Sequence, residues 1–116
     1  MAQSSVQKRF GVVDDDQQRA MSGLEFVQGL VDGTLPLNTM AQTLGYDIVE
    51  VSKGRVVAVA EPHAGHLNAA GTVHGGLAAT LLDSCMGLAI RARSHLDTPA
   101  LCQKRTHAPQ QTKCTG

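Results

Sequence analysis

Apolar residues of the first third of the chain recur at the spacing of a helix. The stripe consists of Leu24, Val27, Leu30 and Val31. Ser22 precedes it and Glu25 follows Ser22 by three residues, which is the capping-box pattern of a helix start. Gly33 and Pro36 come directly after it and cannot continue a helix. The pattern therefore predicts an amphipathic helix over residues 22–32.

The next segments change from helical to strand composition. Residues 39–43 are compatible with one short helical turn, and residues 45–51 then bring in β-branched and aromatic side chains. A short connection containing Gly54 leads into Arg-Val-Val-Ala-Val-Ala at 55–60. Two such runs joined by so tight a connection predict a β-hairpin. Residues 61–72 are rich in Pro, Gly, His and Asn and predict a loop.

A second helix is predicted to begin at His74 and to continue to about Arg93. Its residues are strong helix formers and are apolar on nearly all sides. Such a helix has to be covered by other elements. Its apolar run, residues 77–90, contains Asp83 and is too short to span a bilayer. We therefore expect a core helix.

The two ends of the chain have little apolar periodicity. Residues 1–21 predict a mobile arm that leads into the first helix. Residues 94–116 contain no Val, Ile, Phe, Tyr or Trp, and two prolines interrupt them, so they predict an irregular tail. The folded domain is then expected to cover residues 22–93.

Composition narrows the class of protein. A chain of 116 residues holds one domain, and ten basic residues balance ten acidic ones. This balance and the three aromatic residues give no reason to expect nucleic acid or a membrane as a partner. The three cysteines have no C-x-x-C spacing, and the N-terminus lacks the apolar stretch of a signal peptide. We expect reduced thiols, no cofactor and a cytoplasmic location.

Four residues could together carry chemistry: Asn68, His74, Gly75 and Asp83. Backbone amides at a helix start, here Gly75 and Gly76, can stabilise a developing oxyanion. A carboxylate can act as base or nucleophile, and Asp83 in an apolar helix is costly unless it is paired or used. Taken singly, each residue also has an ordinary structural explanation, such as a turn, a cap or a solvated side chain.

The spacing of His74 and Asp83 bears on assembly. Nine residues on one helix place them on opposite faces and about 13 Å apart along the axis. If both act on one substrate, Asp83 must come from a second subunit, and a two-fold dimer would carry two equivalent sites.

The chain resembles the phenylacetate-degradation branch of the hotdog-fold acyl-CoA thioesterases over residues 22–93. The most specific part is N-x-x-G-x-x-H-G-G followed by Leu-Asp on the helix, here Asn68, Gly71, His74, Gly75, Gly76, Leu82 and Asp83. The resemblance implies an α+β hotdog fold, in which a curved antiparallel sheet wraps a central helix. It implies a homodimer or homotetramer that hydrolyses aryl-acetyl or medium-chain acyl-CoA at the dimer interface.

The resemblance also implies a role for each motif residue. Asp83 would be the general base or nucleophile, and the amide of Gly75 would polarise the thioester carbonyl. His74 would support that carbonyl or its loop. Asn68, from the other subunit, would orient water or substrate. Gly71 and Gly76 would lie against the substrate.

Residues 94–116 depart from the family, whose members have three further strands after the helix. A truncated or out-of-frame gene would give such an ending. The alternative function is therefore an inactive hotdog remnant or an interaction protein. A third possibility is a metal site formed by His63, His66 and His74, since His-x-x-His spacing can fit a metal ion.

Overall fold

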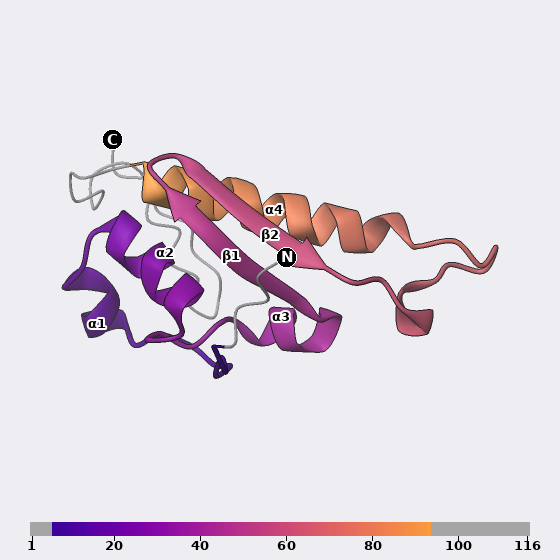
Figure 1. The fold of residues 1–116 in the computed structure, drawn as a ribbon, viewed down its shortest axis with the longest axis horizontal. Helices are drawn as coiled ribbons and strands as arrows, with labels where there is room; N and C mark the ends of the chain where they lie inside the picture. Colours follow the sequence, from indigo (N-terminus) through magenta and orange to yellow (C-terminus); the bar gives the residue numbers. More distant parts are fainter. Residues whose placement is uncertain (1–5, 94–116) are drawn as a thin grey trace, which may run out of the picture.

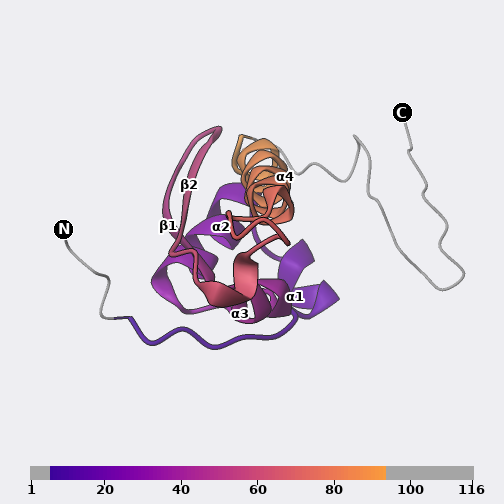
Figure 2. The same ribbon diagram turned by 90° about the vertical axis from the view of Figure 1, so that its right-hand side faces the viewer.

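In the part of the chain that the structure describes, helices combine with a two-stranded antiparallel sheet, and the longest element is the helix that carries the motif. The computed structural model describes residues 6–93; residues 1–5 and 94–116 lie outside it. The elements in chain order are α1 (Asp15–Arg19), α2 (Gly23–Asp32), α3 (Thr39–Leu44), β1 (Tyr46–Ser52), β2 (Arg55–Ala60), the 3₁₀ helix η1 (Ala64–His66) and α4 (Gly75–Ala92). The hairpin runs alongside α4, and α2 packs against both (Figures 1 and 2).

Helix α2 begins and ends where the sequence predicted. The hydroxyl of Ser22 accepts a hydrogen bond from the amide of Glu25 at 3.1 Å, which satisfies one free donor of the first turn. At the other end Gly33 has φ 83°, and its amide donates to the carbonyl of Gly29. Only glycine adopts this left-handed conformation without strain, so it ends the helix.

The hairpin is also confirmed. β1 pairs with β2 from Tyr46 opposite Ala60 to Ser52 opposite Arg55, with an irregularity between Ile48 and Glu50. Gly54 makes the turn with φ 74°. The inward side chains of β1 join the apolar face of α2 and the segments on either side of α3. The buried cluster comprises Val13, Phe26, Val27, Leu30, Leu35, Leu37, Ala41, Tyr46, Ile48 and Ala92.

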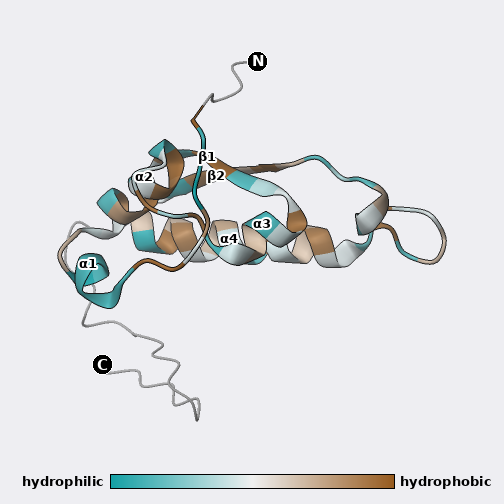
Figure 3. Ribbon diagram, turned by 90° about the horizontal axis from the view of Figure 1, so that it is seen from below, coloured by the Kyte–Doolittle hydropathy of each residue, from teal (hydrophilic) through white to brown (hydrophobic). Residues whose placement is uncertain are grey.

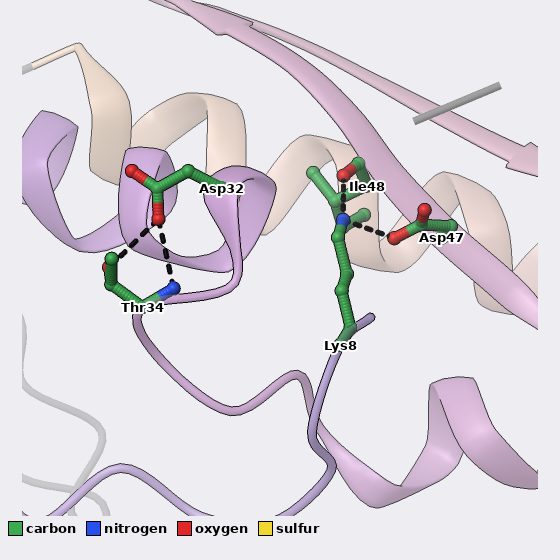
Figure 4. Close-up of polar contacts among 5 residues, drawn as sticks. All are labelled: Lys8, Asp32, Thr34, Asp47 and Ile48. Atoms are coloured by element: carbon green, nitrogen blue, oxygen red, sulfur yellow. Dashed lines mark hydrogen bonds and ion pairs between the residues drawn. The ribbon is translucent and has the colours of Figure 1, made fainter. Parts of the chain in front are cut away.

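The N-terminal segment is packed against the domain, which corrects the prediction of a mobile arm for its described part. Lys8 donates through Nζ to the carboxylate of Asp47 and to the carbonyl of Ile48 (Figure 4). The amide of Gly11 donates to the carbonyl of Leu37 at 2.8 Å, and Val13 is buried. Sequence periodicity missed these contacts because they are made by single side chains and by backbone groups.

Arg91 connects this segment to α4. Its guanidinium lies 3.5 Å from the centre of the Phe26 ring and donates to Oε1 of Gln18 at 3.2 Å. Burial lowers the pKa of Arg91 from its ordinary value, although an arginine remains charged. The ring and the amide oxygen replace water around the cation.

Replacing Lys8 tests the contribution of this packing. The Lys8 side chain is 7% exposed, whereas Asp47 is partly solvated. Lys8→Met keeps much of the apolar stem but leaves Asp47 and the carbonyl of Ile48 without their donor. We expect it to lower the free energy of unfolding by about 1–2 kcal/mol in urea denaturation. The exposed Lys53→Met is the matched control and should change it by less than about 0.5 kcal/mol.

Helix α4 is covered on one face only by the described residues. Leu77 is buried, and Leu81 and Leu88 pack against the buried cluster, whereas Leu82, Met86 and Ile90 are exposed. Hydrophobic positions are visible along the whole helix in Figure 3. Between residues 6 and 93 no helix is long and apolar enough to cross a membrane. The predicted irregular tail, residues 94–116, falls outside the described residues.

Candidate functional site

The start of α4 is shaped by the side chain of His74. This residue is the N-cap of the helix, and its Nδ1 accepts a hydrogen bond from the amide of Gly76 at 2.8 Å. The backbone amide of His74 donates to the carbonyl of His66 at 2.7 Å. A neutral imidazole that accepts at Nδ1 carries its proton on Nε2. His74 is exposed, so its neutral ring presents an Nε2–H donor beside the helix start.

The two glycines of the first turn differ in what they can offer a ligand. A Cβ on Gly76 would lie 2.9 Å from Nδ1 of His74, so the cap requires glycine there. The Gly76 amide is occupied by that cap, contrary to the expectation that both amides are free. A Cβ on Gly75 would meet nothing within 4 Å, and the Gly75 amide has no partner among residues 6–93. Packing among residues 6–93 therefore does not explain glycine at position 75.

Asn68 organises the loop that precedes the helix. Its Oδ1 accepts from the amides of Ala70 and Thr72, and its Nδ2 donates to Oγ1 of Thr72 at 2.9 Å. Gly71 occupies the left-handed region at φ 81°, which favours glycine. The described contacts of both residues are those of a turn former. Their proposed roles toward a substrate remain predictions.

Asp83 lies in the middle of α4 and is exposed. Its carboxylate is therefore solvated, and the prediction that a carboxylate at this position is costly is wrong. It projects from the same side of α4 as Leu82 and Met86, which are also exposed. Gly75 precedes it by eight residues, which corresponds to about 12 Å along the axis and about 80° around it. One chain therefore does not bring Asp83 to the amide of Gly75.

A partly buried polar cluster beside Asp83 was not predicted from the sequence. The hydroxyl of Tyr46, on β1, lies 3.1 Å from Oγ of Ser84 and exchanges hydrogen bonds with the side chain of Asn38. Ser84 follows Asp83 on α4, so this link fixes the rotation of the helix and the direction in which Asp83 projects. The sequence signal that could have predicted this contact is Ser84, a polar residue on the inner face of an otherwise apolar helix.

The three loop histidines are not arranged as a metal site. The rings of His63 and His66 face each other with centroids 3.9 Å apart, and the Nδ1 atoms of these two residues accept backbone amides. Nε2 of His66 is buried and has no hydrogen-bond partner. In residues 6–93 no three His, Cys, Asp or Glu side chains are grouped so that they could hold a metal ion.

An open hollow of about 510 Å³ lies elsewhere, between α2 and the hairpin turn. Glu25, Gln28 and Lys53 are among its lining residues, and none of the motif residues of α4 or its preceding loop contributes to it. The hollow is thus separate from the candidate site.

The chain matches no protein-family model, no curated protein and no solved structure.

Proposed function

We propose that the protein is a hotdog-fold acyl-CoA thioesterase that works as a two-fold dimer, with aryl-acetyl or medium-chain acyl-CoA as substrate. The observation that carries this proposal is the free amide of Gly75 at the start of α4, with the exposed carboxylate of Asp83 eight residues later on the same helix. The ordered motif from Asn68 to Asp83 supports the family assignment.

A two-fold axis can bring these groups together. If two α4 helices lie antiparallel with the axis at Ala79, residue i of one faces residue 158 − i of the other, and Asp83 faces Gly75. Ala79 is exposed and small, so the two helices can approach closely there. Both sites of the dimer are then equivalent.

The chemistry follows from the groups so assembled. The thioester carbonyl oxygen accepts from the amide of Gly75, with His74 Nε2–H as a second donor. The carboxylate of Asp83 takes a proton from water, and the water oxygen attacks the carbonyl carbon. The carbon–sulfur bond breaks, and the departing thiolate takes up the proton. The products are a carboxylic acid and coenzyme A.

Subunit complementation tests the arrangement. Asp83→Asn lacks the carboxylate, and Gly75→Pro lacks the amide hydrogen, so each alone should keep at most about 1% of the wild-type rate toward phenylacetyl-CoA. A 1:1 mixture should recover about a quarter of the wild-type rate, because half of the dimers are mixed and each of these has one intact site. Thiol release measures the rate. No recovery after confirmed subunit exchange would contradict a shared site.

The exposed face of α4 favours a second candidate, an interaction protein without turnover. In the described part of the chain, two strands cover one side of α4 and leave three large apolar side chains exposed. Apolar patches of this kind are typical of binding surfaces. A wild-type chain that forms a dimer but releases no thiol from phenylacetyl-CoA or octanoyl-CoA would support this candidate.

A further inference from the structure

The open hollow between α2 and the hairpin turn lies beside the end of α4. A Cβ on Gly23, which precedes the first lining residue of α2, would lie 1.8 Å from the carbonyl oxygen of Arg91. A Cβ on Gly54, which follows the lining residue Lys53, would lie 4.0 Å from the side chain of Arg93. The end of α4 is therefore adjacent to both elements that form the hollow (Figures 1 and 2). The chain continues from this point.

The lining of the hollow combines apolar and acidic side chains. Leu24 and Val51 pack against the buried cluster but are only half-buried, so each keeps apolar surface in the hollow. Glu25 and Asp32 contribute two negative charges and Lys53 contributes one positive charge, which leaves a net charge of −1. The hollow thus fits a segment that carries both aliphatic and basic side chains.

Residues 94–116 have this composition. Their charged residues are Lys104, Arg105, Lys113 and Asp97, and their large aliphatic residues are Leu96 and Leu101. With neutral histidines their net charge is +2, whereas the seven basic and nine acidic residues of positions 1–93 give −2. The zero net charge of the whole chain is thus the sum of two oppositely charged parts, and these attract each other.

The segment that follows α4 is also long enough. The hollow extends along α2 from Leu24 to Asp32, eight residues that correspond to about 12 Å of helix. Residues 94–105 would span roughly 40 Å if fully extended. They can therefore follow the whole hollow from the end of α4, and they need no regular secondary structure to do so.

We infer that residues 94–105 return along this hollow and link α2 to the hairpin of the same chain. Their two leucines pack on the apolar lining residues, and Lys104 and Arg105 lie beside the two carboxylates. The inference is independent of the proposed function, because no motif residue of α4 or its preceding loop lines the hollow.

Disulfide formation in the full-length chain tests this contact, because Cys102 lies within the segment. Gln28→Cys places a thiol on the lining of the hollow, and Gln42→Cys is the matched control, an exposed glutamine of α3. Both variants also carry Cys85→Ala and Cys114→Ala. Position 28 should form a disulfide with Cys102 at least about tenfold faster than position 42, because docking raises the local thiol concentration. Each rate is divided by the reactivity of the introduced thiol with iodoacetamide.

Charge reversal then tests the basic end of the segment. In the Gln28→Cys chain, Glu25→Lys should slow the disulfide about two- to fivefold, the scale of an exposed charge pair. Adding Lys104→Glu and Arg105→Glu should recover most of that loss. Glu61→Lys is the control, since Glu61 is exposed and does not line the hollow, and it should change the rate by less than about 1.5-fold.

Three results would overturn the inference. The first is an equal rate for positions 28 and 42 in variants that keep the helical circular dichroism of the wild type. The second is an equal effect of Glu25→Lys and Glu61→Lys. The third is a disulfide that joins two chains and slows on dilution, which would assign the hollow to the segment of a second copy. Thioesterase activity enters none of these measurements, so loss of the proposed function would leave the inference standing.

Discussion

Asp83→Asn is expected to lower the turnover of phenylacetyl-CoA by at least about a hundredfold, the usual scale for a lost general base. The amide has nearly the shape of the carboxylate but cannot take a proton from water. KM should change much less than kcat because the substitution leaves the apolar surroundings intact. Thiol release under saturating substrate measures the effect.

Because Asp83 is exposed, an effect of its substitution on turnover can be distinguished from an effect on folding. Replacing a solvated carboxylate should leave the free energy of unfolding within about 0.5 kcal/mol of the wild type. Asp14→Asn is the matched control, since Asp14 is exposed and makes no side-chain cap hydrogen bond at α1. A wild-type rate in the Asp83 variant would rule out the proposed role of this carboxylate.

Gly75→Pro is expected to reduce turnover by roughly 10²- to 10³-fold, the scale found when one oxyanion donor is removed. Proline is favoured at the first position of a helix, where the amide hydrogen has no intrahelical partner. His74 is extended at φ −65° and ψ 133°, which a following proline tolerates. The substitution should therefore remove the donor and preserve the helix.

Gly75→Ala separates loss of the amide from addition of a side chain. It keeps the N–H, and its Cβ meets no atom of the described residues within 4 Å. We expect both variants to retain the helical circular dichroism of the wild type, and the alanine variant to be the more active. If alanine and proline reduce the rate equally, space beside the helix, rather than the amide donor, is what the reaction requires.

The elements could be predicted well from the sequence because their signals are local. Ser22 with Glu25 and Gly33 defined α2, and the Gly54 turn between β-branched runs defined the hairpin. The N-terminal contacts could not be predicted in this way. Lys8 reaches a strand almost forty residues later, and no periodicity in the sequence encodes such a pair.

In the candidate site, too, some local features could be predicted from the sequence and contacts between distant residues could not. The turn at Asn68 depends on near neighbours and fits an ordinary local rule. The N-cap role of His74 was not predicted, because histidine is not among the residues that usually cap a helix. The solvation of Asp83 depends on which face of α4 meets the hairpin. The hydrogen bond between Tyr46 and Ser84 contributes to that choice, and only the assembled fold reveals it.

The hydrogen bond between Arg91 and Gln18 joins the beginning of the described chain to the end of its last helix. A ribosome synthesises Gln18 long before Arg91, so the first helix cannot complete its packing while α4 is still being made. The hairpin and α2, which are close in sequence, can assemble earlier. We therefore expect the nascent chain to keep an unfinished N-terminal segment until translation has passed α4, and to be most sensitive to proteases and chaperones during that interval.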